Sequence, residues 1–245
     1  MKKLPEITIA FWIMKICATT LGETAGDLLS MTLNVGYAIS SIILISIFLI
    51  TLITQLISKQ HNPVLYWTVI LSTSTAGTTM SDYMDRTLGL GYATGSLILI
   101  GILLTIFVFW RISEKSLSVT NITTRKGELL YWTAILFSNT LGTAFGDFLA
   151  DDSGLGFGGG AVLIGSLLVL IIFTKYFTKI STVLLFWIAF VLTRPFGATF
   201  GDFLTKTKEK GGLDFGTKGS SLILFIILAA LVIYSSIRKN KKPSY

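Results

Sequence analysis

The chain has 245 residues, of which 52% are hydrophobic and only 13% are charged, and its formal net charge is +7. Soluble proteins carry about 25% charged residues, so a soluble fold would lack the polar surface needed to cover the apolar segments. Several apolar runs reach the roughly 20 residues that a bilayer span requires. The composition predicts a multi-span helical membrane protein. It argues against a nucleic-acid partner, because a basic tail on such a chain is typical of an anchor to anionic lipid.

A short motif, first seen at residues 20–27, occurs four times, and each copy ends in an aspartate. A tryptophan stands fifteen positions before each aspartate. The aspartates are Asp27, Asp82, Asp147 and Asp202, and the tryptophans are Trp12, Trp67, Trp132 and Trp187. A long period kept across a whole chain is typical of a repeat architecture.

Each repeat is predicted to form two helices: a polar one that ends near the aspartate, and an apolar one after a short link. The predicted repeats cover residues 7–58, 63–112, 128–178 and 181–237 of a single membrane domain, residues 1–245. The link pairs are Gly36-Tyr37, Gly91-Tyr92, Gly156-Phe157 and, as their counterpart in the fourth repeat, Asp214-Phe215. Two spans per repeat give all four repeats the same orientation. The expected fold class is an all-α membrane protein with eight transmembrane helices arranged as four parallel tandem helical hairpins.

Basic residues are unequally divided between the two sides of this layout. Thirteen fall on the side of the termini: Lys2, Lys3, Lys59, Arg111, Lys115, Arg125, Lys126, Lys175, Lys179, Arg238, Lys239, Lys241 and Lys242. Five fall on the other side: Arg86, Lys206, Lys208, Lys210 and Lys218. By the positive-inside rule, both termini lie in the cytoplasm, and the tryptophans fall where an aromatic belt is expected.

Four tandem two-helix repeats, one tryptophan in each and a Gly-x-x-x-Gly-Asp-like signature give the chain a family resemblance. It resembles a bacterial integral membrane family known only as a repeat of unknown function. The resemblance covers essentially the whole chain. It implies the eight-span layout and a place in the bacterial cytoplasmic membrane, and it implies no activity, so the function has to be inferred from the residues.

Polar residues recur every four positions before each aspartate, which puts them on one face of a helix. These ladder residues are Thr19 and Glu23, Ser74 and Thr78, Asn139 and Thr143, and Arg194 and Ala198. Oxygen-rich sites with carboxylates suit hard cations such as Mg²⁺, Ca²⁺ or Mn²⁺. The candidate ion path is lined by Glu23, Asp27, Asp82, Asp147, Asp202, Thr78, Thr143, Thr19, Asn139 and Arg194. The candidate metal ligands are Glu23, Asp27, Asp82, Asp147 and Asp202.

Glu23 stands one turn before Asp27 and has no acidic counterpart in the other repeats. An ionisable group inside a span is costly and usually faces a partner or water. Its predicted counter-charges are Lys15 and Arg194, so a structural Glu23–Arg194 ion pair between the first and last repeats is an open alternative to an ion site. Four aspartates and Glu23 against these two bases leave three negative charges, which favours a cation. The aspartates themselves are open to a second interpretation, in which they are solvated at the helix ends.

The leading hypothesis is a transport protein for a small cation, with divalent ions among the candidates. The stretch from Glu23 to Asp27 resembles the Glu-x-Gly-Asp signature of a cation/proton exchanger family linked to manganese and calcium. The chain shows no nucleophile–base pair and a single histidine, His61, so neither an enzyme nor a bound cofactor is expected. Two alternatives stay open. One is a carrier or binding protein for a small organic or lipid molecule, with its mouth lined by Tyr37, Tyr92, Phe157 and Phe215. The other is a scaffold whose polar ladder only holds the helices together.

Overall fold

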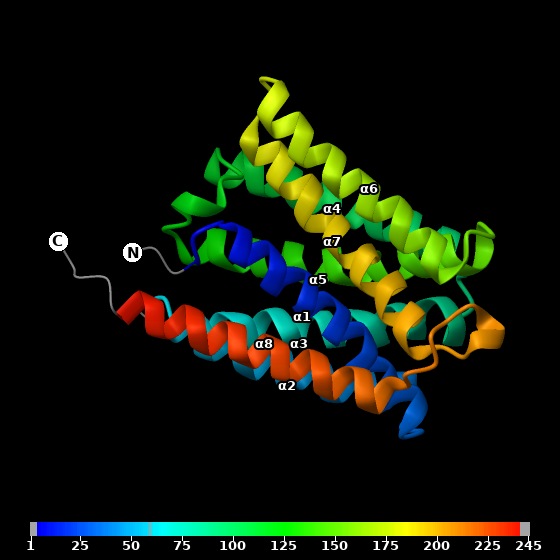
Figure 1. The fold of residues 1–245 in the computed structure, drawn as a ribbon. Helices are drawn as coiled ribbons and strands as arrows, with labels where there is room; N and C mark the ends of the chain where they lie inside the picture. Colours follow the sequence, from blue (N-terminus) through cyan, green and yellow to red (C-terminus); the bar gives the residue numbers. More distant parts are fainter. Residues whose placement is uncertain (1–3, 59, 241–245) are drawn as a thin grey trace.

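The computed structural model describes residues 4–58 and 60–240. Within them it contains eight long α-helices and no β-strand (Figure 1). The odd-numbered helices carry the repeated motif: α1 (Ile9–Asp27), α3 (Pro63–Asp82), α5 (Arg125–Asp147) and α7 (Thr182–Thr205). The even-numbered helices are α2 (Tyr37–Ile57), α4 (Tyr92–Glu114), α6 (Gly156–Phe177) and α8 (Thr217–Asn240).

Local sequence signals mark where the odd helices begin and end. The side chains of Thr8, Asn62 and Thr124 accept hydrogen bonds from backbone N–H groups in the first turns of α1, α3 and α5, which satisfies donors that a helix start leaves free. In three repeats the α-helix ends at the aspartate and continues as one π-helical turn. These turns are η1 (Leu28–Thr32), η2 (Tyr83–Thr87) and η4 (Phe148–Asp152).

Each even helix begins at, or directly after, a glycine with positive φ, a conformation that glycine adopts without a Cβ clash. These glycines are Gly36, Gly91, Gly156 and Gly216, with φ between 67° and 80°. The predicted counterpart in the fourth repeat, Asp214-Phe215, is therefore corrected to Gly216. The reason is that the lysine-rich insertion forms its own short turn, Lys208–Lys210, and delays the start of α8.

The four odd helices form a closed ring, in which α1 contacts α3, α3 contacts α5, α5 contacts α7 and α7 contacts α1. A glycine makes each contact close: Gly22 meets Ser74, Gly77 meets Asn139, Gly142 meets Arg194 and Gly197 meets Thr19. A Cβ atom built on Gly77 would lie 2.9 Å from the backbone of Asn139, and one on Gly197 would lie 2.6 Å from Oγ1 of Thr19. Small residues at these contacts therefore let neighbouring odd helices pack closely. The four odd helices surround one central axis.

The even helices surround this ring, and each packs mainly on the odd helix of the following repeat. The pairs are α2 with α3, α4 with α5 and α6 with α7, while α8 returns to α1. The two helices of one repeat therefore pack mainly on neighbouring repeats and not on each other. Each repeat instead covers the outside of the next odd helix, so the four repeats depend on one another for their apolar contacts.

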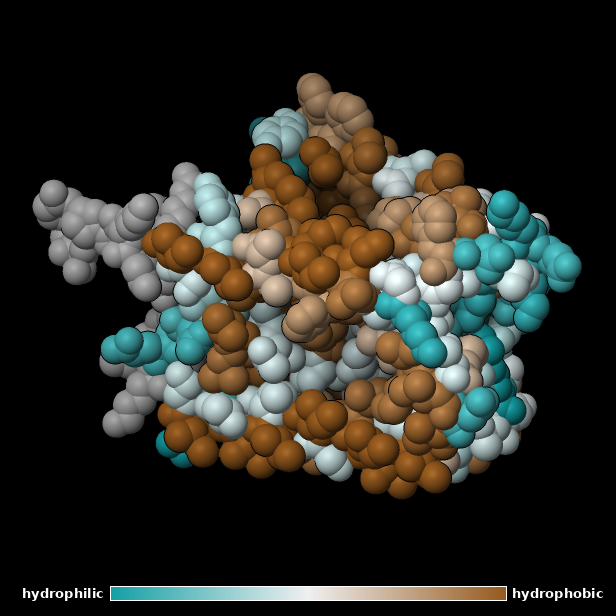
Figure 2. Space-filling model, turned by 60° about the horizontal axis from the view of Figure 1, so that its bottom comes forward, coloured by the Kyte–Doolittle hydropathy of each residue, from teal (hydrophilic) through white to brown (hydrophobic). Residues whose placement is uncertain are grey.

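Among the described residues, five helices are long and apolar enough to cross a membrane: α2, α4, α6, α7 and α8. The even helices expose many Ile, Leu, Val and Phe side chains. Figure 2 shows apolar side chains over the middle of one face, with hydrophilic ones gathered toward its right-hand end. Helices α1, α3 and α5 are less apolar because they carry the threonines, serines and acids that the ring buries.

The start of α1 and the end of α8 lie at the same end of the bundle (Figure 1). We call this the tryptophan end and the opposite one the aspartate end, after the residues that the odd helices carry there. Of the basic residues used for the predicted topology, Lys2, Lys3, Lys59, Lys241 and Lys242 lie outside the described residues.

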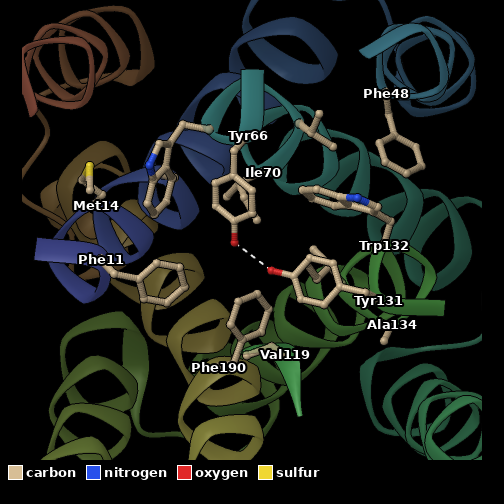
Figure 3. Close-up of a cluster of buried hydrophobic side chains, with 14 of the residues drawn as sticks. Phe11, Met14, Phe48, Tyr66, Ile70, Val119, Tyr131, Trp132, Ala134 and Phe190 are labelled. Atoms are coloured by element: carbon tan, nitrogen blue, oxygen red, sulfur yellow. Dashed lines mark hydrogen bonds between the residues drawn. The ribbon is translucent and has the colours of Figure 1, made fainter. Parts of the chain in front are cut away.

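Aromatic side chains fill the ring at the tryptophan end (Figure 3). The hydroxyl groups of Tyr66 and Tyr131 lie 2.7 Å apart across the axis. Trp67, Trp132 and Trp187 are at most 4% exposed. The predicted aromatic belt is therefore wrong for these three tryptophans, because their side chains pack inside the bundle, where their large apolar surface is buried.

Candidate functional site

The polar faces of the odd helices meet inside the ring, and every residue of the predicted ladders is at most 3% exposed. The residues are Thr19, Glu23 and Asp27 of α1; Ser74, Thr78 and Asp82 of α3; Asn139, Thr143 and Asp147 of α5; and Arg194, Ala198 and Asp202 of α7. The open interpretation of the aspartates as solvated helix ends is thereby excluded. Together these residues form a polar column along the axis of the bundle.

At the middle of the column, Arg194 binds side chains or backbone from the three other odd helices. Its Nη2 lies 2.9 Å from Oε2 of Glu23 and donates to Oγ1 of Thr78 at 2.5 Å and of Thr143 at 2.7 Å. Its Nη1 donates to the carbonyl oxygen of Thr19 at 3.3 Å. The two threonine hydroxyls donate in turn to Oε2 of Glu23, at 3.4 Å and 3.2 Å. These five residues are called the inner cluster below, and the Glu23–Arg194 ion pair left open by the sequence is present in it.

Lys15 and Asn139 form a layer between the inner cluster and the aromatic side chains. The Lys15 Nζ donates to Oδ1 of Asn139 at 3.5 Å and lies 4.1 Å from the ring centroid of Phe190. The Asn139 amide donates to Oγ1 of Thr73 at 2.9 Å. Lys15 therefore contacts an amide oxygen and an aromatic face, an arrangement that stabilises a buried cation, while Arg194 is the base that contacts Glu23.

The four aspartates form a ring at the aspartate end of the column, called the acidic ring below. Arg86, from the turn η2, joins two of them. Its Nε lies 3.0 Å from Oδ1 of Asp82, and its Nη2 lies 3.1 Å from Oδ2 of Asp147. This base therefore links α3 to α5.

Lys206 joins the other two aspartates from the loop that follows α7. Its Nζ lies 2.7 Å from Oδ2 of Asp27 and 3.1 Å from Oδ1 of Asp202. It therefore links α7 to α1, as Arg86 links α3 to α5. Burial alone would lower the pKa of Arg86 and of Lys206, but the adjoining aspartates outweigh it and hold both pKa values above their ordinary range.

The predicted helix ends leave Arg86 and Lys206 in loops, whereas the structure brings both side chains into the acidic ring. A signal for them exists, because each stands four residues after the aspartate of its repeat, and this spacing brings side chains together on a helix. Met31 and Asp151 occupy the same position in the first and third repeats. The predicted excess of three negative charges falls to one: among the described residues, the column holds Glu23, the four aspartates, Lys15, Arg86, Arg194 and Lys206.

Three of the five predicted metal ligands come together. Glu23, Asp147 and Asp202 each place one carboxylate oxygen within 4.8 Å of the others. Ca²⁺ binds oxygen at about 2.3–2.6 Å, so ligands on opposite sides of one such ion are roughly 5 Å apart. The spacing suits a single hard cation between the inner cluster and the acidic ring. Asp27 and Asp82 are outside this trio. They share Lys206 and Arg86 with the trio members Asp202 and Asp147.

Of the four aromatic residues predicted to line an opening for an organic ligand, only Tyr37 and Tyr92 lie near a common side chain, Arg86. The Arg86 guanidinium lies 5.9 Å from the ring centroid of Tyr37 and 5.6 Å from that of Tyr92. Phe157 is buried, while Phe215 is 65% exposed. These four side chains therefore have different surroundings: Tyr37 and Tyr92 lie near Arg86, Phe157 is buried and Phe215 is exposed.

Comparison with known proteins identifies the repeat and leaves the activity open. A family model described as Repeat of Unknown Function (DUF347) matches four segments, residues 10–61, 65–116, 130–181 and 185–240. No curated protein matches the chain. No solved structure matches it either.

Proposed function

The chain belongs to the DUF347 repeat family, and we propose that it is an eight-span protein of the bacterial cytoplasmic membrane, with cytoplasmic termini, that carries a small cation along the polar column. The observation that supports this proposal most is the carboxylate trio of Glu23, Asp147 and Asp202. Three buried carboxylates close together are costly unless positive charge offsets them, here from Arg194, Arg86 and Lys206 or, in this proposal, from a bound cation. Carboxylate oxygens select hard cations, with Mg²⁺, Ca²⁺ and Mn²⁺ as the first candidates.

In this proposal, Arg86 and Lys206 act as built-in counter-ions of the acidic ring. Their side chains are 30% and 19% exposed, so both contact solvent at the aspartate end while they neutralise the aspartates. A cation that enters from that end replaces one of these bases on the aspartates and then reaches Glu23. The base moves outward at little electrostatic cost, because water solvates the released ammonium or guanidinium group.

The rest of the column explains why we propose a carrier and not an open channel. Arg194 occupies the axis beyond Glu23, with its bonds to Glu23 and the two threonines. The Tyr66–Tyr131 hydroxyl contact closes the axis again at the tryptophan end. An ion can leave toward that end only after these contacts separate, which is a conformational step of the kind that carriers make.

The first experiment measures thermal unfolding of the purified full chain against a panel of monovalent and divalent cations. A ligand that binds only the folded state stabilises it by about 2.7 kcal/mol at a hundred times its Kd. We expect a selective shift that is lost in Glu23→Gln and in Asp147→Asn. Asp151→Asn is the matched control, since Asp151 is exposed outside the ring and should keep the shift. Flux of the selected ion into proteoliposomes then tests transport.

The scaffold alternative keeps one specific observation in its favour: in the inner cluster the Arg194–Glu23 ion pair is bonded to groups of all four odd helices. In that case Glu23→Gln and Asp147→Asn would destabilise the chain without changing a response to any cation. Equal stability of both variants and no cation shift at all would also contradict the carrier and turn attention to an organic ligand.

A further inference from the structure

A second feature lies on the outside of the ring, away from the polar column. A groove of about 760 Å³ runs between α4 and α7. Its walls are apolar, with Leu103, Leu104 and Phe107 from α4 and with Leu184 and Ile188 from α7. Leu104 is 58% exposed and Leu184 is 53% exposed, so these walls need an apolar partner.

One end of the groove is basic. Arg111, in the last turn of α4, and Lys115, which follows it, both line this end and are exposed. Both belong to the tryptophan end of the bundle, where α4 finishes and α7 begins. The groove therefore combines a long apolar wall with two positive charges at one end.

The position of this basic end is held by the linker between the second and third repeats. Lys115 ends α4 in a left-handed conformation, with φ of 57°. Two residues later, the carbonyl oxygen of Leu117 accepts a hydrogen bond of 2.9 Å from Nε1 of the buried Trp187. The linker is thus tied to α7, and Lys115 stays beside the groove.

Arg111 itself is not repeated, although bases such as Lys175 and Lys179 also stand near the end of another even helix. The matched repeat segments align Arg111 with Leu56 in the first repeat and Tyr176 in the third. Neither of these residues carries a charge.

We propose that the groove binds one anionic phospholipid, with its acyl chains along α4 and α7 and its phosphate between Arg111 and Lys115. An anionic head group complements the two bases, whereas a zwitterionic one brings its own cation to them. The acyl chains fill the groove between the apolar walls of α4 and α7. This inference rests on the proposed membrane location and is independent of cation transport.

The test is native mass spectrometry of the full chain, released from bilayers that hold equal amounts of phosphatidylglycerol and phosphatidylcholine. We expect one retained phosphatidylglycerol and a preference for it that falls at least about tenfold in R111Q/K115Q. The matched control is K175Q/K179Q, which removes two exposed bases from the same end of the bundle and should keep the preference. Equal retention of both lipids, or an unchanged preference in R111Q/K115Q, would overturn the proposal.

A second variant tests the apolar wall with all charges kept. Ile188→Trp fills the groove and should release the lipid, whereas Ile172→Trp on the exposed side of α6 should not. A stable dimer that excludes lipid and separates in Ile188→Trp would show that the groove receives a second copy of the chain instead. Glu23→Gln should retain the lipid whatever it does to the cation response, so the failure of one proposal is distinguishable from the failure of the other.

Discussion

The inner cluster and the acidic ring use the same chemistry, a base held between oxygen ligands, in two different environments. The Arg194 side chain is 0% exposed, and every one of its partners lies inside the ring. Arg86 and Lys206 reach the acidic ring from turns and loops and keep contact with solvent. A wholly buried ion pair is costly to open, and a partly exposed one can exchange its partner. Under the proposed function, the inner cluster acts as a lock that holds the four odd helices together, and the acidic ring is where a base exchanges with a cation.

The acidic ring contains four equivalent aspartates but only two bridging bases, Arg86 and Lys206, among the described residues. Each of the four repeats contributes one aspartate, but only the second and fourth contribute the bridging base. Each base therefore serves its own aspartate and one from a neighbouring helix. Two bridging bases and Arg194 do not balance the charges of Glu23 and the four aspartates, and the proposed cation would supply the missing positive charge.

The largest effect is expected from breaking the lock. Arg194→Met leaves Glu23 buried without its counter-charge, and loss of one partner of a buried pair costs about 3–5 kcal/mol. The free energy of unfolding in detergent measures it. Adding Glu23→Gln to Arg194→Met should restore much of the stability, because the uncompensated charge is removed. Single and double variants of equal stability would contradict a lock.

The next effect tests the close helix approach that supports the lock. A Cβ atom at Gly142 would overlap Cγ of Arg194, so Gly142→Ala should destabilise the chain by about 1–3 kcal/mol through overpacking. Gly101→Ala in α4 is the control, because nothing lies within 4 Å of its Cβ position and alanine is the better helix former. Thermal unfolding should therefore show a loss for the first and no loss for the second.

A smaller effect on stability is expected at the acidic ring. Lys206→Met removes contacts to Asp27 and Asp202, but the loss should stay below about 2 kcal/mol because solvent screens a partly exposed pair. The same change should strengthen the stabilisation by cations, since one competing base is gone. Lys208→Met, at an exposed residue of the same loop, should change neither quantity. A weaker cation response in Lys206→Met would argue against exchange at the ring.

The smallest effect concerns pH and lies just beyond α3. Burial raises the pKa of Asp85 to about 6, although Ser81 and Arg86 act to lower it. The folded state therefore binds the proton more tightly than the unfolded chain, whose aspartates titrate near pH 3.9. The contribution of Asp85 to the free energy of unfolding is therefore largest below about pH 4 and is lost as the pH rises to about 6. Asp85→Asn should flatten this part of the pH profile of unfolding, and an unchanged slope would contradict the shift.

Several features of the column and of its helices could be predicted from short-range patterns in the sequence. Glu23, the four aspartates and the threonines share a helix face because a spacing of four residues is a local property of the α-helix. Helix starts at Thr8, Asn62 and Thr124 follow from local capping. The same four-residue spacing pairs Arg86 with Asp82 and Lys206 with Asp202. It does not predict their second partners, Asp147 and Asp27, which lie in other repeats.

The sequence by itself determined the repeat, the eight helices, and the polar face of each odd helix, because all of these depend on short-range spacing along one chain. The tertiary structure decided which residues from different helices meet. Lys206 contacts Asp27 across 179 positions of the chain, and Arg194 contacts Glu23 across almost as many. The tertiary structure also decided that each even helix packs on the odd helix of the next repeat. Such pairings depend on how four similar helices close into a ring, and no spacing within a single helix specifies that closure.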